Sequence, residues 1–310
     1  MQIKISVVIP TYQRIDMLKT CLLALDEQTI HPAFYEVIAV DDQSPNFQEK
    51  KEVIEGHPYQ YSFQLILAPK GGPAKARNLG ARLAKGDVVV FLDDDTIPTP
   101  TWLEEILKAF EKSSHAGIGG MTYNVKTKTL SEKLLHHVNH LHSPTDPVSQ
   151  QVTFLVTVNA AFQKRVFEEI GGFDEDFKLP CGEDIDFGYR VRKKGYTLGV
   201  AQNAVVLHHQ RDTLKGMFKN WYLYGKGIYR CQHKHQKELS QLDSYSDTTL
   251  LGNKKLLKHV NDYFGLYASL WKDPEISWWE FLLIPNLHVV NFLYYLAGRF
   301  SEARLLRAQS

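Results

Sequence analysis

The sequence predicts an α/β fold in which a mostly parallel, twisted sheet is flanked by helices and followed by a C-terminal helical extension. In the first half of the chain, short apolar runs rich in Val and Ile alternate with amphipathic helical patterns. Several of these runs end in polar residues, as strands do at the sheet edge where ligands bind. The last third departs from this alternation and interleaves basic with aromatic residues.

Apolar, β-branched runs of five or six residues predict buried strands. The expected strands are 5–9, 35–40, 63–67 and 88–92, with a late strand at 204–209. Amphipathic helices are expected from Asp16, over 74–85 and over 102–112, and Gly86 closes the second. Thr96–Pro100 predicts a turn after the fourth strand, because neither Pro98 nor Pro100 can continue a strand or stand inside a helix.

Composition excludes several classes of protein. The 310 residues are 44% hydrophobic and 23% charged, which is typical of a globular chain, and the net charge of +1 does not indicate a nucleic-acid partner. Cys21, Cys181 and Cys231 are scattered without metal spacing, which favours a reducing compartment over a disulfide framework. Met1 runs almost directly into a strand, and no uninterrupted apolar stretch is long enough to span a bilayer. A cytoplasmic location is therefore expected.

Three carboxylates follow the fourth strand, at Asp93, Asp94 and Asp95. They would repel one another unless a cation lay among them, so they predict a divalent-metal site for a phosphorylated ligand. The alternative is a solvated acidic turn. Two other strands of the expected sheet end in Pro10-Thr11-Tyr12 and Asp41-Asp42, and these three clusters should converge on one crevice.

Phosphate-binding loops of the common kinds are absent from the sequence. No G-x-G-x-x-G follows the first strand, and no G-x-x-x-x-G-K-[ST] occurs. The nearest candidate is Gly71–Asn78, which begins a helix whose N-terminus attracts anions. The guanidinium of Arg77 would add a fixed positive charge that can bind phosphate through two N–H groups. A plain helix start with a solvated Arg77 is the alternative.

Several motifs, taken in order, resemble the family 2 glycosyltransferases, which are inverting, metal-dependent enzymes with the GT-A nucleotide-diphospho-sugar transferase fold. The resemblance covers roughly the first two-thirds of the chain. The motifs are Val8–Arg14, Val40–Ser44, Ala76–Gly80, Phe91–Asp95, Asn159–Phe162, Ile170–Glu175 and Gly182–Arg190. It implies a catalytic domain at 1–212, which leaves 213–310 as a helical extension. Contact of this extension with a membrane surface, with another subunit or with the catalytic domain is left open.

The resemblance assigns a nucleotide-sugar site to the first three motifs. Tyr12 would stack on the nucleobase, and Asp42 would accept a hydrogen bond from the imide of uracil or thymine. A core tyrosine and a turn-capping aspartate are the alternatives. Arg77 would meet the phosphates or the ribose. Pro10, Thr11 and Arg14 complete the expected donor site.

The D-x-D pattern of the family falls on Asp93 and Asp95. Asp95 would hold Mn²⁺ or Mg²⁺, and Asp93 and Asp94 would serve the ribose or the metal's water shell. His208 fits the position of a further metal or diphosphate ligand better than His209, while a solvated or core-satisfied pair is equally open.

Asp184 would be the general base of an inverting transfer, with Glu183 binding the acceptor and Asp186 structural. The alternative is that two acids in a first helical turn only meet the helix dipole.

The C-terminal third offers a membrane interpretation. Lysines and an arginine between Lys215 and Lys237 alternate with aromatic residues, which suits an anionic membrane surface, although an ordinary packed helix has the same composition. A polar connection is expected at 240–253, then two short helices hinged at Pro285, with a transmembrane span disfavoured by interrupting polar residues.

His136 and His140 stand one helical turn apart, and a polar helix face or acceptor lining is favoured over a zinc site.

Together these features predict transfer of a sugar from a nucleoside-diphosphate sugar, of UDP or dTDP type, to a saccharide or lipid-linked hydroxyl acceptor in polysaccharide or glycolipid synthesis. Peripheral contact with the inner face of the cell membrane is left open. The rivals are a nucleotidyltransferase, which would carry a glycine-rich basic loop after its first strand, and a non-catalytic nucleotide-sugar-binding scaffold, which would lack Asp95 or Asp184.

Overall fold

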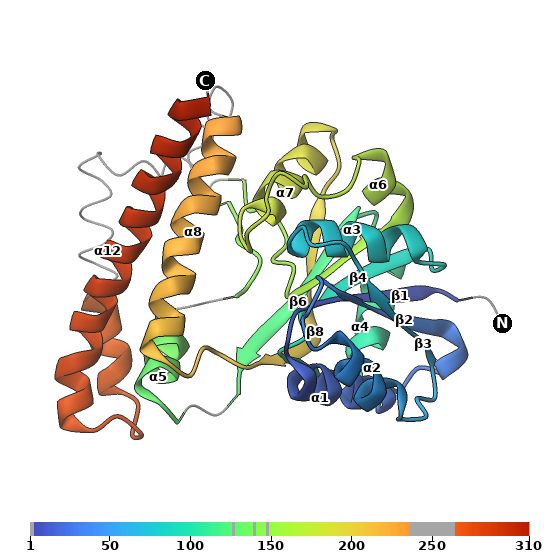
Figure 1. The fold of residues 1–310 in the computed structure, drawn as a ribbon, viewed down its shortest axis with the longest axis horizontal. Coiled ribbons are helices and arrows are strands. Elements are labelled where there is room, and N and C mark those ends of the chain that lie inside the picture. Colours follow the sequence, from blue (N-terminus) through green and yellow to red (C-terminus); the bar gives the residue numbers. More distant parts are fainter. Residues whose placement is uncertain (1–2, 126–127, 139–140, 147–148, 236–263, 310) are drawn as a thin grey trace. The chain divides into compact units, whose positions relative to one another are not determined.

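The computed structural model describes residues 3–125, 128–138, 141–146, 149–235 and 264–309 (Figure 1). The chain divides into two compact units. One, here called the sheet unit, comprises Met1–Tyr123 and Leu141–His209, and the other, the helical unit, comprises Asn124–His140 and Gln210–Ser310. The boundary expected between residues 212 and 213 stays a prediction. His140, Lys237 and the polar connection at 240–253 lie outside the described residues.

The sheet unit is built on an eight-stranded sheet in the order β3-β2-β1-β4-β7-β6-β8-β5. The strands are β1 (Ile5–Thr11), β2 (Tyr35–Asp41), β3 (Ser62–Leu67), β4 (Val88–Leu92), β5 (Thr96–Pro98), β6 (Gly117–Asn124), β7 (Asn159–Gln163) and β8 (Leu198–His208). The first four pair in parallel, whereas β7 pairs antiparallel with both β4 and β6. The predicted α/β class is confirmed, in the form of a mixed sheet.

Helices cover both faces of this sheet (Figure 1). They are α1 (Ile15–Asp26), the 3₁₀ turn η1 (Pro32–Phe34), α2 (Phe47–Glu55), α3 (Pro73–Leu83), α4 (Trp102–Glu111), α6 (Lys164–Glu169) and α7 (Glu183–Lys193). Leu18, Leu22 and Leu25 recur at helical spacing and bury one face of α1 in a core shared with α2 and α4. A second core holds α3, α6 and α7 on the opposite face. The sheet is therefore buried on both sides, which leaves its strand ends as the place for a polar site.

The turn predicted at Thr96–Pro100 is wrong in its first half, where Thr96–Pro98 forms β5 and pairs antiparallel with β8. Pro98 is tolerated because β5 lies at the edge of the sheet, so the missing N–H faces no neighbouring strand. This pairing places Thr96 opposite His208. It thereby brings the end of β8 to the acids that follow β4.

The helical unit contains α5 (Leu130–Val138), α8 (Leu214–Lys234) and α12 (Trp278–Gln309). Gly225 of α8 and Gly298 of α12 face the backbone of the opposite helix so closely that neither position has room for a Cβ atom. The Glu302 carboxylate is 2% exposed and forms ion pairs with Arg230 and Lys226 of α8. Two of the basic residues attributed to a membrane surface are thus engaged within the unit.

The prediction of two short helices hinged at Pro285 is wrong, because α12 continues through this proline. Proline has no N–H for the carbonyl oxygen one turn earlier, so α12 lacks one helical hydrogen bond at this point. One residue further on, the Asn286 side chain donates to the carbonyl oxygen of Leu282 at 2.8 Å. Packing along α8 supports the remainder of the helix. By length and composition Trp278–Ala308 could cross a membrane, but core helices of soluble proteins can have the same character, so membrane contact stays a prediction.

Candidate active site

The carboxyl ends of β1, β2 and β4 meet at one edge of the sheet, because these strands are parallel neighbours. The hydroxyl of Thr11 donates to Asp94 Oδ2 at 2.8 Å, and the Asp42 N–H donates to the Thr11 carbonyl oxygen at 3.0 Å. The three polar clusters expected to converge are therefore in direct contact. Pro10 is the last but one residue of β1, opposite Val40.

The two residues predicted to hold the nucleobase differ in their surroundings: the Tyr12 side chain is partly exposed, and the Asp42 carboxylate is hydrogen-bonded within the protein. Tyr12 is 39% exposed, and the Lys70 ammonium lies 4.4 Å from the centre of its ring. The Asp42 carboxylate accepts backbone N–H groups of Gly71 at 2.7 Å and Gly72 at 3.1 Å. Asp42 therefore caps the turn that leads into α3, as the alternative interpretation expects, and its contact with a base stays a prediction.

Arg14 supplies a positive charge to the acids after β4. Its Nη1 lies 2.8 Å from Asp94 Oδ1 and 2.5 Å from Asp95 Oδ2. Burial raises the pKa of Asp94 to about 6, and the Arg14 guanidinium opposes this rise. Asp94 and Asp95 are both about 95% buried. The mutual repulsion that the sequence implies is thus relieved here by an internal cation.

Asp95, in the turn between β4 and β5, and His208, at the end of β8, approach each other as a shared metal ion would require. Asp95 Oδ1 lies 3.4 Å from His208 Nε2, whereas the bond from His209 to Asp95 is made by its backbone N–H, to the Asp95 carbonyl oxygen. His208 Nδ1 is buried without a hydrogen-bond partner among the described residues.

Asp95 and His208 fit Mg²⁺ or Mn²⁺ if other ligands complete the coordination shell. No cluster of three or more His, Cys, Asp or Glu side chains suited to a metal occurs in the described part of the chain. Two protein ligands are enough where phosphate oxygens and water complete the shell, which is the common arrangement for Mg²⁺. The site therefore fits a metal that arrives with a diphosphate.

Arg77 joins the acids after β4 to the start of α7. It is 4% exposed, and its guanidinium lies 2.8 Å from Asp93 Oδ1 and 2.8 Å from Glu183 Oε1. Gly72, at a φ of 85°, and Pro73 begin the helix that carries it. Arg77 thus forms two internal ion pairs, and its predicted contact with phosphate or ribose is untested.

The first turn of α7 carries the proposed base. Gly182 adopts a left-handed φ of 98° immediately before it. Burial, and then the neighbouring Glu183 carboxylate, raise the pKa of Asp184 to about 7. Asp186 is fully buried and pairs with Arg190 at 2.8 Å, in keeping with a structural role.

Glu183 was predicted to bind the acceptor. It is 3% exposed, and both of its carboxylate oxygens have partners, Arg77 for Oε1 and the Cys181 N–H for Oε2. Acceptor contact by Glu183 stays a prediction, and it would require one of these bonds to open.

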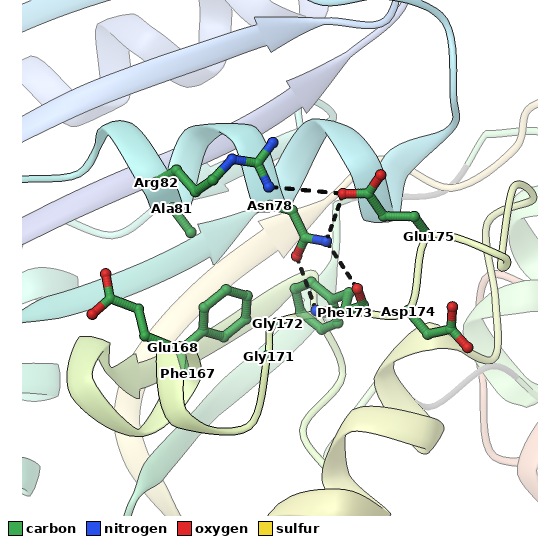
Figure 2. A pocket seen from close by; sticks show the side chains of 10 residues that line it. All are labelled: Asn78, Ala81, Arg82, Phe167, Glu168, Gly171, Gly172, Phe173, Asp174 and Glu175. Atoms are coloured by element: carbon green, nitrogen blue, oxygen red, sulfur yellow. Dashed lines mark hydrogen bonds and ion pairs between the residues drawn. The ribbon is translucent and has the colours of Figure 1, made fainter.

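Sequence reasoning missed Asn78, the neighbour of Arg77. Its side chain donates to the Phe173 carbonyl oxygen at 2.8 Å and accepts the Phe173 N–H at 2.9 Å (Figure 2). These bonds hold the loop that leads towards α7. The adjacent cavity, about 520 Å³, is lined from α3, α6 and residues 171–175, and none of the predicted site residues lines it. This cavity and the predicted donor site therefore do not coincide, and a donor site at the strand ends stays a prediction.

The histidine cluster belongs to the helical unit. His137 contacts Ser269 Oγ at 2.7 Å and Asp273 at 3.2 Å, and His136 lies 3.5 Å from Asn124. A metal shared with His140 lies outside what the described residues can test.

The mixed sheet and the acids at its carboxyl edge define the GT-A class of glycosyltransferase folds. Over 98% of its length the chain matches the mannosyltransferase PcManGT of Pyrobaculum calidifontis, solved with GDP-Man and Mn²⁺, at a TM-score of 0.62 and 18% identity across 88% of that protein. S. aureus TarS 1–349 in complex with UDP-GlcNAc matches at a TM-score of 0.54 and 16% identity, covering 97% of this chain and 92% of that one.

The chain belongs to glycosyl transferase family 2, whose model matches residues 6–171. Validoxylamine A glucosyltransferase of Streptomyces hygroscopicus subsp. limoneus is 29% identical over 232 residues, which cover 64% of this chain and 50% of that protein. The chain spans about half the length of the first curated relatives that it matches.

Proposed function

We propose that this protein is an inverting glycosyltransferase that moves a sugar from a nucleoside-diphosphate sugar, of UDP or dTDP type, to a hydroxyl acceptor. One observation carries the proposal. The buried guanidinium of Arg77 spans from Asp93, among the acids suited to a metal diphosphate, to Glu183, the neighbour of the candidate base. The groups that would bind the donor and accept the proton are therefore linked through one side chain. Family membership and the nucleotide sugars bound by relatives of the same fold support it.

The donor would lie across the ends of β1, β2 and β4. Tyr12 offers an exposed aromatic face for the base, beside Asp42, Pro10 and Thr11. Asp93 and Asp94 would contact the ribose or ordered water, and Arg14 and Arg77 would meet the diphosphate. Mg²⁺ or Mn²⁺ held by Asp95 and His208 would neutralise the diphosphate and the charge that develops on the leaving nucleotide.

Asp184 would accept the proton of the acceptor hydroxyl as that oxygen attacks the anomeric carbon opposite the departing diphosphate. An α-linked donor then yields a β-linked product. A base whose pKa lies near 7 is half deprotonated at neutral pH and still basic enough to take the proton. The ring of hydrogen bonds around Asn78 and Phe173 would keep the loop before α7 in place during this step.

The acceptor would be a saccharide or a lipid-linked intermediate of polysaccharide or glycolipid synthesis. We assign residues 213–310 as the extension that would meet it, at a cytoplasmic location that includes peripheral contact with the inner face of the membrane. The length and apolar character of α12 support membrane contact. Nucleotidyl transfer is the second candidate, and the missing glycine-rich loop after β1 disfavours it.

Calorimetric binding of a panel of nucleoside diphosphates, with and without Mn²⁺, tests the proposal. We expect UDP or dTDP to bind most tightly, and only with the metal. A folded protein that binds none of the panel would refute the donor-site assignment. Binding of nucleoside triphosphates with release of pyrophosphate would instead support nucleotidyl transfer.

A further inference from the structure

Lys50 is a fully buried lysine beneath the candidate base-binding loops. It lies on α2, whose buried residues are Lys50 and Ile54. Both Lys50 and its partner Asp41 are 0% exposed, and Lys50 Nζ lies 2.6 Å from Asp41 Oδ2. An ammonium group is costly to bury, so a position like this demands complete pairing.

Three acceptors meet the three N–H bonds of this ammonium group. Besides Asp41, Lys50 Nζ donates to Thr11 Oγ1 at 3.2 Å and to Ser44 Oγ at 3.3 Å. Ser44 also donates its backbone N–H to Asp41 Oδ1 at 2.6 Å. We call Thr11, Asp41, Ser44 and Lys50 the Lys50 cluster. Its members come from the end of β1, the end of β2, the following loop and α2.

The cluster joins two loops, each of which carries one residue predicted to hold the base. Tyr12 follows Thr11 in the first loop, and Asp42 follows Asp41 in the second. Ser44 Oγ also accepts the backbone N–H of Gln13 at 2.7 Å. Tyr12 and Asp42 are thus each flanked by atoms that the cluster holds.

Both loops adopt backbone conformations that need such support. Gln13 has a φ of 63° and Gln43 a φ of 59°, in the left-handed region that residues other than glycine seldom adopt. Such conformations persist where the surrounding structure enforces them, and they concentrate at binding sites. The Lys50 cluster contributes to this by bonding the Gln13 N–H to Ser44 Oγ and the Ser44 N–H, next to Gln43, to Asp41 Oδ1.

We propose that Lys50 is a positioning residue that sets the base selectivity of the donor site, by holding the Tyr12 loop and the Asp42 loop at a fixed separation. This inference rests on the proposed function. Lys50 touches no substrate and acts through Thr11, Ser44 and Asp41. The ligand is the base of a nucleoside diphosphate, which must fit between the ring of Tyr12 and the carboxylate of Asp42.

The decisive variant removes both charges of the buried pair, as Lys50→Met with Asp41→Asn. Removing them together avoids leaving one buried charge without its partner. Calorimetry with UDP, CDP, GDP and ADP in the presence of Mn²⁺ measures selectivity. We expect the preference of the wild type for its best nucleotide to fall by about tenfold or more, because discrimination depends on precisely placed polar groups. The dependence on Mn²⁺ should persist, since Asp95 and His208 are unchanged.

Lys51→Met is the matched control, because Lys51 is the next residue on the same helix with a side chain 46% exposed. It should keep wild-type selectivity. Ser44→Ala is the second variant, chosen for the case in which the double variant does not fold. It disconnects Gln13 from the cluster and leaves the Lys50–Asp41 pair in place, and it should reduce selectivity in the same direction.

A readout without nucleotide separates positioning from binding. The backbone amides of Gln13, Asp42 and Ser44 should exchange hydrogen faster in the variants than in the wild type and the control. Undiminished selectivity in a folded double variant, or in folded Ser44→Ala if the double variant is unfolded, overturns the inference and leaves the proposed function intact. A wild type that binds no nucleotide overturns both.

Discussion

Two groups of acids in the sheet unit differ in what balances their charge. Of the strand-end acids, Asp94 and Asp95 lie against the guanidinium of Arg14, and Asp93 pairs with Arg77. The helix-start acids are Glu183 and Asp184, and only Glu183 has an ion pair among the described residues, with Arg77. The strand-end acids therefore lie against arginine side chains, whereas Asp184 has no ion pair among the described residues, which is compatible with its predicted role as the base.

The pKa values express the same difference. Burial raises the pKa of Asp94 to about 6 even with Arg14 in contact. Asp184 reaches about 7, because burial and the Glu183 carboxylate act in the same direction. A carboxylate with a pKa near neutrality suits proton transfer, whereas carboxylates that lie against guanidinium groups are favoured in the charged form, which is also the form that binds a metal. Four experiments test this division of roles.

Asp184→Asn should have the largest effect on sugar transfer. Asparagine has nearly the same shape but cannot accept a proton, so we expect kcat to fall by about 10² to 10⁴. Donor affinity, measured by calorimetry, should stay close to that of the wild type. Asp176→Asn, in the preceding loop, is the control and should retain activity. Transfer at the wild-type rate by Asp184→Asn would mean that another group is the base.

Arg77→Met should lower the stability of the protein, because it removes an ion pair from both groups of acids. It leaves the buried Glu183 carboxylate without its cation, which costs about 3–5 kcal/mol in the free energy of unfolding. Denaturant titration measures this loss. Arg82→Met, on the same helix but with a side chain 61% exposed, should cost less than about 1 kcal/mol. Equal losses in the two variants would show that the bridge contributes no special stability.

Arg77 also illustrates how far the sequence could predict this site. The β-α-β alternation located β1, β2, β4 and α3 to within a few residues, since buried strands and amphipathic helices have local patterns. The acids at the strand ends followed from that order. The ion pair between Arg77 and Glu183 spans 106 residues of sequence, so no local pattern reports it.

Other features depend on tertiary contacts that the sequence does not display. Lys50 lies in the charged sequence E-K-K-E, which predicts a solvent-exposed side chain. The packing of α2 instead turns Lys50 inward. Pro98 enters a strand because β5 is an edge, and Pro285 stays within a helix that packs along α8. The antiparallel half of the sheet depends on β6, β7 and β8, which pair across long separations in sequence.

Arg14→Met should separate metal binding from nucleotide binding by changing them in opposite directions. Arg14 occupies the carboxylates Asp94 and Asp95, so its removal should let Mn²⁺ alone bind about tenfold more tightly. The affinity for a nucleoside diphosphate with Mn²⁺ should fall, since one diphosphate ligand is lost. Manganese titration followed by electron paramagnetic resonance gives the first quantity and calorimetry the second. Weaker binding of Mn²⁺ alone would exclude competition by Arg14.

The smallest expected effect is a shift in the pH profile of kcat/KM, which reports ionisations of the free enzyme. The base must be deprotonated, so activity should fall as the pH drops through the pKa of Asp184, about 7. The Glu183 carboxylate contributes to raising that pKa, so Glu183→Gln should move the midpoint to lower pH and preserve activity further into the acid range. Glu168→Gln, with a side chain 59% exposed, is the control and should leave the midpoint in place. An unchanged midpoint in active Glu183→Gln would mean that the acid limb belongs to another group, with Asp94 among the strand-end acids the next to test.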